Sequence, residues 1–226
     1  GSGAGREQAL NPAVAKATAV KARNVRRFTA VEFTLRAKLT HMAFPSVETL
    51  TTIVDPIAAS HHMDVEEIKI NRAGSKTVVA VALDSDNRPD LDTLEVVSGE
   101  ISEAFDGAEE SGIIAFGGQG YTLEVSTPGV DHPLTLPRHW RRNRGRLVTW
   151  DDGGTKRTGR IGALNDAETE VVLISREGKN MCVDVRKVAE IGQAVVEIEF
   201  ATVPADEKAV ADEDFNIAAE RREEHK

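Results

Sequence analysis

Cysteine and aromatic residues are scarce in this chain of 226 residues. Cys182 is the only cysteine, so no internal disulfide can form and a zinc site could not use paired thiolates. Aromatic residues make up 4% of the chain, so the cores must rest on Val, Ile, Leu and Ala. No apolar run approaches the ~18 residues of a membrane span, and we find no secretory signal pattern. We therefore expect a cytoplasmic protein that is neither secreted nor inserted in a membrane.

A recognisable catalytic set is also missing. The sequence contains no Gly-x-Ser-x-Gly elbow, and Cys182 lies in a predicted strand without an obvious base. His61, His62, His132 and His139 are too scattered for metal-ligand spacing, and solvated or capping histidines explain them better. We predict no catalytic residue, no metal and no cofactor.

One acidic loop, residues 84–95, comes near a metal-binding pattern. Its five carboxylates match the spacing of a calcium loop, but Arg88 and Pro89 stand where that loop needs an oxygen ligand and a glycine. The better interpretation is a surface loop that leads into a helix, whose N-terminus favours carboxylates.

Charge is distributed unevenly, although the whole chain carries −9. The net charge is +6 over residues 1–41, −13 over 42–134, +2 over 135–203 and −4 over 204–226. We interpret 1–41 as a basic extension, artificial or upstream of a natural start at Met42, with a transit peptide as the alternative. The acidic end, 204–226, is expected to be a disordered tail.

The segment 42–134 predicts a two-layer α/β domain of order α-β-β-α-β. Apolar residues recur at helical spacing after Ser46 and again after Asp92, where Asp92 and Glu95 resemble a capping box. Alternating apolar residues mark the strands between and after them. The predicted elements are a helix from 46 to about 61, strands over 65–71 and 77–83, a helix from 92 to about 107, and a strand over 121–125.

The segment 135–203 predicts a basic helix followed by a small β-barrel. Five short β-type runs follow the helix at close intervals, which is typical of a closed Sm-like or SH3-like barrel. The predicted elements are a helix over 136–143 and strands over 146–150, 156–164, 169–175, 180–185 and 194–200. The fold class is therefore α+β.

A basic stretch at the start of the second domain is the candidate binding site. Arginine forks suit phosphates, and an indole can stack on a base, so the stretch predicts an RNA contact. The alternative is a solvated helix face that offsets the acidic domain beside it. The candidate residues are Arg138, Trp140, Arg141, Arg142, Arg144, Arg146, Lys156, Arg157 and Arg160.

Residues 124–134 read Glu-Val-Ser-Thr-Pro-Gly-Val-Asp-His-Pro-Leu. This motif resembles the signature of the RimP ribosome maturation factors, Glu-Val-Ser-Ser-Pro-Gly-x-Asp/Glu-Arg-Pro-Leu. Thr127 keeps the hydroxyl of the usual serine, whereas His132 loses the permanent cation of the usual arginine. The motif makes physical sense as a hinge, because Pro-Gly turns the chain and the second proline blocks regular pairing. The hinge residues are Glu124, Ser126, Pro128, Gly129, Asp131, Pro133 and Leu134.

The resemblance implies an N-terminal α/β domain, an Sm-like barrel and a role in ribosome assembly without catalysis. It further implies binding to the free small (30S) ribosomal subunit. From its charge, we expect the basic stretch 138–160 to meet the phosphates of the small-subunit rRNA. The barrel is expected to contact a basic ribosomal protein, number twelve of that subunit. The alternative function is a stand-alone Sm-like RNA-binding regulator, which would bind short single-stranded RNA and ignore purified subunits.

Overall fold

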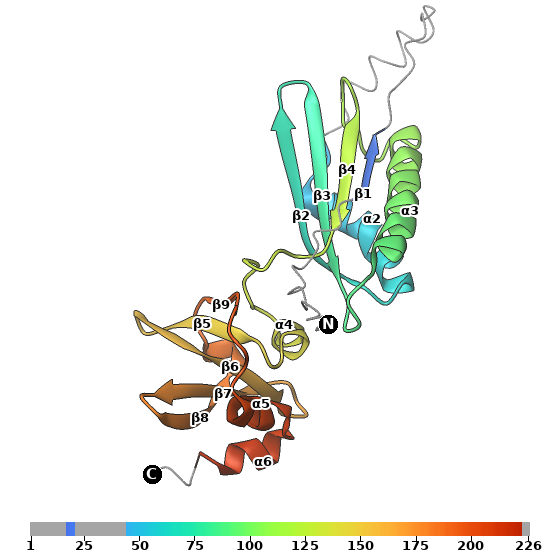
Figure 1. Cartoon of the computed structure of the whole chain (residues 1–226). Helices are drawn as coiled ribbons and strands as arrows, with labels where there is room; N and C mark the ends of the chain where they lie inside the picture. Colours follow the sequence, from blue (N-terminus) through green and yellow to red (C-terminus); the bar gives the residue numbers. More distant parts are fainter. Residues whose placement is uncertain (1–16, 21–43, 223–226) are drawn as a thin grey trace, which may run out of the picture. The chain divides into compact units, whose positions relative to one another are not determined.

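The computed structural model describes residues 17–20 and 44–222 of the chain (Figure 1). These residues form a mixed α+β protein with two separate sheets. The chain divides into two compact units between Pro128 and Gly129, within the 124–134 motif. The boundary expected from the sequence lies a few residues later, after Leu134. Most of the predicted extension 1–41 lies outside the described residues.

The first unit contains a four-stranded sheet of order β1-β4-β3-β2. The hairpin strands β2 (Asp64–Ala73) and β3 (Lys76–Asp84) pair antiparallel, whereas β3 pairs parallel with β4 (Tyr121–Ser126). Two parallel neighbouring strands need a crossover connection, and the helix between β3 and β4 in the chain supplies it. Strand β1 (Ala17–Val20), which the sequence analysis did not predict, pairs antiparallel with β4. The α-β-β-α-β order is otherwise as predicted.

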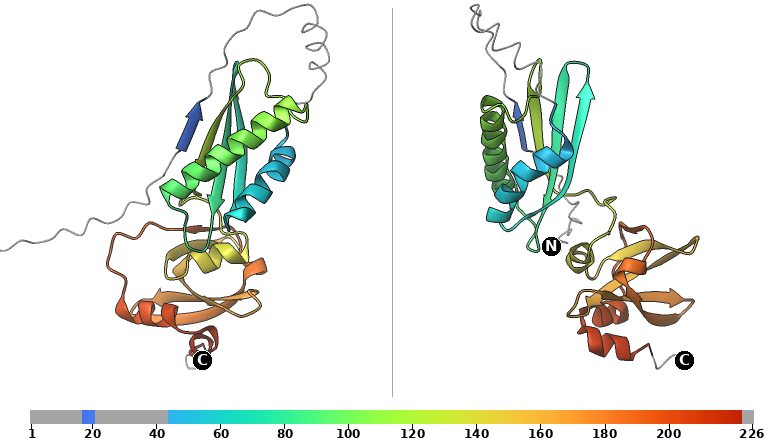
Figure 2. Two further views of the ribbon diagram at one scale, coloured as in Figure 1. Left: turned by 90° about the vertical axis from the view of Figure 1, so that its right-hand side faces the viewer. Right: turned by 180° about the vertical axis from the view of Figure 1, so that it is seen from behind.

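Two helices cover one face of this sheet, α2 (Val47–Ser60) and α3 (Leu91–Glu110) (Figure 2). Ser46 caps α2, as predicted, by accepting a hydrogen bond from the Thr49 N–H at 3.2 Å. The predicted capping box of α3 is wrong, because Asp90 makes the cap. The core between helices and sheet is aliphatic with a few aromatic rings; its fully buried side chains include Leu50, Leu83, Leu94, Ile101, Phe105 and Leu123.

The second unit begins with the short helix α4 (Pro137–Arg142) and continues into a five-stranded sheet of order β8-β7-β6-β5-β9. The prediction of a closed barrel is wrong. Strands β8 and β9 are the two edges of the sheet, and among the described residues no strand pairing joins them. The last strand has three residues where the sequence predicted seven, since only Ala194–Val196 pair with β5. The strands are β5 (Leu147–Asp152), β6 (Thr155–Leu164), β7 (Glu170–Glu177), β8 (Asn180–Lys187) and β9 (Ala194–Val196), with a 3-10 turn at Val188–Glu190.

Two helices follow β9, where the sequence predicted a disordered tail. Helix α5 (Ala205–Asp212) and helix α6 (Phe215–Glu220) pack on the sheet through Val210, Ala211 and Ala218. The prediction of disorder is wrong for these residues, because β7 is buried on both faces and needs a cover on each. Val171 and Leu173 belong to one core, whereas Val172 and Ile174 belong to the core that α5 and α6 complete.

Candidate nucleic-acid interface

The 124–134 motif joins the two units and is anchored at both ends. Glu124 and Ser126 lie on β4 of the first unit. Between Gly129 and His132 the backbone makes a turn, closed by a hydrogen bond of 3.0 Å from the His132 N–H to the Gly129 carbonyl. Leu134 is buried in the core of the second unit, and its N–H donates to the Ala194 carbonyl at 2.9 Å. The predicted role of this motif as a hinge stays a prediction.

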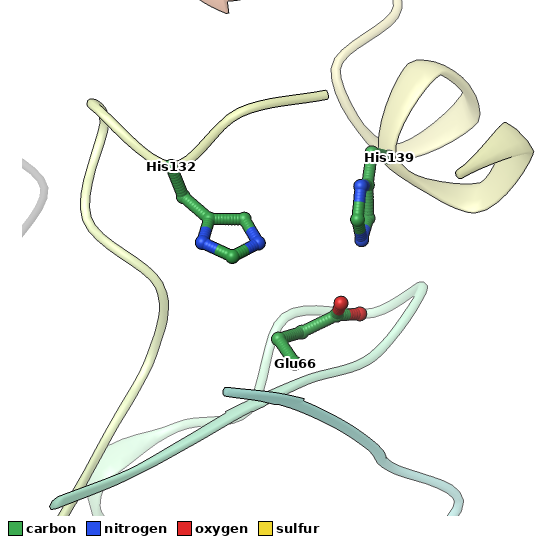
Figure 3. Close-up of side chains that lie close together, drawn as sticks. All are labelled: Glu66, His132 and His139. Atoms are coloured by element: carbon green, nitrogen blue, oxygen red, sulfur yellow. The ribbon is translucent and has the colours of Figure 1, made fainter. Parts of the chain in front are cut away.

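A histidine caps the helix that follows. The Nδ1 atom of His139 accepts hydrogen bonds from the backbone N–H groups of Thr135 (3.1 Å) and Leu136 (3.2 Å), at the N-terminus of α4. Figure 3 shows His139 beside His132, and their ring centroids are 5.5 Å apart in an edge-to-face arrangement. The expectation of a capping histidine is confirmed for His139, whereas the contact between the two rings could not be predicted from the spacing of these histidines.

Trp140 anchors α4 to the second unit. Its side chain is 1% exposed and packs in a core with Val148, Trp150 and Ile161. The prediction that this indole lies in an exposed patch is wrong, because α4 is short and its single large apolar side chain has to face the core. The indole Nε1 has no hydrogen-bond partner among the described residues.

The arginines of α4 flank this anchor. Arg141 is exposed and forms an ion pair with Glu168, whereas Arg138 and Arg142 are half-buried. An exposed ion pair contributes little stability, so the Arg141 guanidinium can exchange its carboxylate for a phosphate at low cost. Helix α4 therefore presents arginine side chains from a backbone that a buried tryptophan and a histidine cap hold in place.

The next two arginines have partners within the second unit. Arg144 donates from Nε to the Ala211 carbonyl and from Nη2 to the Glu213 carbonyl, both at 2.6 Å. Arg146 donates from Nη1 to the Asn143 Oδ1 at 3.1 Å. Arg144 thus satisfies carbonyl groups at the C-terminal end of α5, where a cation is favoured.

The cations of β6 divide between surface and interior. Lys156 and Arg157 are exposed, and Arg157 pairs with Asp152 at 3.0 Å. Arg160 is 1% exposed, so the prediction that it lies on the surface is wrong. The predicted patch is therefore not one continuous arginine surface. Its exposed members are Arg141 on α4, Arg144 in the turn after α4, and Lys156 and Arg157 on β6, whereas the interior holds Trp140 and Arg160.

Two carboxylates from the C-terminal segment hold Arg160 in the interior. Its Nη1 and Nη2 donate to the two oxygens of Glu199 at 2.9 and 2.8 Å, and its Nε donates to Glu207 at 3.0 Å. The hydrogen bonds to Glu199 raise the pKa of Arg160, and the same contact lowers the pKa of Glu199. A buried charge is tolerated only with such partners, which the sequence could not reveal because they lie about forty residues away.

Arg176 on β7 completes this ion network, and the sequence analysis did not select it. Its Nε donates to the second oxygen of Glu207 at 2.6 Å, and its Nη2 donates to Asp206. The hydrogen bond to Asp206 raises the pKa of Arg176 and lowers that of Asp206. The position of Arg176 at the end of a buried apolar strand is the only sequence signal that could have pointed to it.

The acidic loop before α3 serves the helix cap. The Asp90 carboxylate accepts hydrogen bonds from the Thr93 N–H at 2.7 Å and the Thr93 hydroxyl at 2.6 Å. The hydroxyl hydrogen bond, followed by the backbone one, lowers the pKa of Asp90. This geometry confirms the interpretation of a loop leading into a helix.

Within the described part of the chain, no helix is both long and apolar enough to span a membrane. A basic helix, α4, follows the Pro-Gly junction at the start of the second unit. Comparison with known proteins identifies the family of the chain. Residues 53–131 match the family model of the RimP N-terminal domain.

Three relatives are named ribosome maturation factor RimP. The protein of Corynebacterium diphtheriae is 55% identical over 185 residues, which cover 82% of this chain and 100% of the relative. The protein of Corynebacterium aurimucosum is 48% identical (78% of this chain, 95% of the relative), and that of Corynebacterium kroppenstedtii is 40% identical (77% and 98%). The chain belongs to the RimP family of ribosome maturation factors, as the 124–134 motif predicted.

Proposed function

We propose that this protein binds the free small ribosomal subunit in the cytoplasm and assists its maturation without catalysis. Its partners are the rRNA of that subunit and the basic ribosomal protein number twelve, which the second unit contacts. Family membership supports the role in ribosome maturation. The RNA contact rests on helix α4, which carries Arg138, Arg141 and Arg142 around the buried Trp140.

This helix suits phosphate recognition because its position is determined by packing. Arginine binds phosphate through a planar fork of N–H donors, and a preorganised backbone reduces the entropy lost on binding. Trp140 in the core and the His139 cap both restrict the helix. The observation that most supports the proposed RNA contact is the packing of α4, which holds the backbone that bears these arginines in one position.

The first unit has the opposite electrostatic character. Helix α2 carries two acidic residues and α3 carries seven, and neither contains Lys or Arg. Such a helical layer repels phosphate, so RNA binds elsewhere on the chain. The contrast between the acidic helices of the first unit and the arginines of α4 then sets the orientation and the rate of encounter with the subunit more than the final affinity.

Charge reversal on α4 tests the proposal. The triple variant Arg138→Glu, Arg141→Glu and Arg142→Glu should weaken binding to purified small subunits by about tenfold or more, because it removes cations that displace counterions. Arg144 is left intact, since it caps α5. The variant's melting curve establishes that both units remain folded.

A matched control changes the net charge equally at exposed sites outside α4. The variant Lys76→Glu, Lys179→Glu and Lys187→Glu should retain most of the binding. Equal weakening in both variants would mean that net charge alone acts. Binding of the folded α4 variant at the original strength would rule out α4 as the contact, and tight binding of the unaltered chain to short single-stranded RNA alone would favour a stand-alone RNA-binding regulator.

A further inference from the structure

The C-terminal segment from Glu197 to Arg222 holds three arginines of the second unit. Glu207 receives Arg160 on one carboxylate oxygen and Arg176 on the other, at 3.0 and 2.6 Å. Arg144 donates to the Ala211 and Glu213 carbonyls at the far end of the same helix. Donors of Arg144, Arg160 and Arg176 are therefore engaged by one segment, and we call these three the covered arginines, although only Arg160 is buried while Arg144 and Arg176 stay partly exposed.

We infer that this C-terminal segment is a built-in competitor for phosphate, displaced when the covered arginines meet ribosomal RNA. The inference rests on the proposed function and extends it, since it assigns a second phosphate-binding surface and a way of opening it. The surface would comprise Arg160 and Arg176 on the face of the sheet that α5 and α6 occupy, together with Arg144 in the turn before β5.

The geometry of the contacts matches what phosphate would offer. Arg160 pairs with Glu199 through two parallel N–H donors at 2.9 and 2.8 Å, and Arg176 reaches both oxygens of Asp206. Forked pairing of this kind is the mode in which arginine binds both carboxylate and phosphate. An RNA backbone can therefore replace the carboxylates without rearrangement of the guanidinium groups.

The segment is built so that it can leave the sheet. Helices α5 and α6 have eight and six residues, and helices this short do not persist without packing. From Glu197 to Val203 the one backbone hydrogen bond among the described residues is that of the Glu197 N–H with the Leu147 carbonyl, and Phe200 is 92% exposed. Glu199 is the one residue of this connection whose side chain is held, by Arg160, among the contacts described.

Departure of the segment is costly unless an anion replaces it. Arg160 is 1% exposed, and a charge that loses its partners in a buried site is strongly unfavourable, so this arginine favours the closed state when no other anion is present. The apolar contacts of Val210 and Ala218 with the sheet favour the same state. A polyanion such as RNA is the ligand that compensates the lost carboxylates, so opening requires its phosphates.

The first test measures affinity for naked small-subunit rRNA. The variant Asp206→Asn, Glu207→Gln should bind this RNA about tenfold more tightly than the unaltered chain, because it weakens the competitor and keeps every arginine. The control Asp214→Asn, Glu220→Gln removes the same number of charges from exposed positions of the same segment and should change affinity far less. Equal affinities of the two variants would overturn the inference.

A second variant, with a readout of folding, distinguishes the displacement of α5 from a general loss of structure. Both tryptophans of the chain, Trp140 and Trp150, lie in the core on the other face of the sheet, so their fluorescence reports whether that core remains intact. Val210→Ala loosens α5 without changing charge and should also raise RNA affinity with the tryptophan signal unchanged. A loosened α5 with no gain in affinity would contradict the inference.

Amide hydrogen exchange of the unaltered chain provides the third measurement. We expect the amides of α5 to exchange faster when the chain is bound to free small subunits than when it is alone. Unchanged protection of α5 in a complex that forms normally would refute the displacement and leave the proposed function standing. If no complex forms, the proposed function fails, and the naked-RNA comparison still decides the inference.

Discussion

At the scale of single residues, burial decides what a side chain can do. Trp140 stands among five arginines in the sequence and suggests a stacking surface, yet it is buried in an aliphatic core. The arginines around Trp140 favour an exposed role in the sequence. The structure shows that the rotation of α4 about its own axis places its one large apolar side chain in the core.

The first prediction concerns this anchor. Trp140→Ala should lower the free energy of unfolding by about 3–5 kcal/mol, because it leaves a large cavity. Trp140→Phe should cost less than about 2 kcal/mol, since the lost indole N–H has no hydrogen-bond partner in the described structure. Urea denaturation measures both. A fully stable Trp140→Ala variant that no longer binds RNA would restore the stacking role.

Tyr121, the only tyrosine of the chain, allows a direct measurement of its ionisation. Burial, followed by the nearby Asp106 and Glu109 charges, raises the pKa of this phenol to about 12, against the opposing hydrogen bond with Ser102. The tyrosinate absorbance should therefore appear about two pH units above the ordinary value of about 10. The stability that Tyr121 contributes is complete below pH ~10 and is lost as the pH rises towards 12. A midpoint near 10 in the folded protein would show that the ring is solvated.

At the scale of elements, β7 shows how much the sequence could have revealed. Residues 171–174 read Val-Val-Leu-Ile, and such a continuous apolar run indicates a strand buried on both faces. A second cover was therefore required. The segment after Pro204 was interpreted as disordered because of its acidic composition, although Val210, Ala211 and Ala218 provide that cover. The helices and strands with regular periodicity were predicted within a few residues.

Two glycines should respond in opposite ways to the same substitution. A Cβ atom at Gly162 of β6 would lie 2.9 Å from the Val172 side chain, so Gly162→Ala should destabilise the second unit by about 1–3 kcal/mol. Gly99 in α3 has open space around it, so Gly99→Ala should stabilise the first unit by about 0.5–1 kcal/mol. Thermal unfolding measures both shifts. A Gly162→Ala variant that is as stable as the unaltered chain would contradict the close packing of β6 on β7, and a destabilised Gly99→Ala variant would contradict the open space around Gly99.

Docking of α5 should be sensitive to acid. Hydrogen bonds from Arg160 and Arg176 lower the pKa values of Glu199 and Asp206, so these carboxylates stabilise the fold above their unfolded pKa values. That stability is lost as the pH falls from about 4 through the lowered folded values. Hydrogen exchange at decreasing pH should show α5 opening before α3. Simultaneous opening of both helices would contradict a separate contribution from the ion network.

At the scale of the whole molecule, the sequence predicted the family and the division into an acidic and a more basic unit. The eleven-residue motif identified the family because its Pro-Gly turn and second proline occur at a fixed spacing. The arrangement of the arginines was not predictable, because their partners Glu199, Glu207 and Glu213 lie far along the chain. A count of charges along the sequence does not distinguish an arginine that is paired inside the protein from one that is free to bind at the surface.

The central claim is that the free small subunit is the partner of this protein. Gradient sedimentation of a lysate, with the chain detected in each fraction, tests this claim most directly. We predict that the chain travels with free small subunits and is absent from assembled ribosomes. A chain that stays at the top of the gradient, or that follows assembled ribosomes equally, would contradict the proposal.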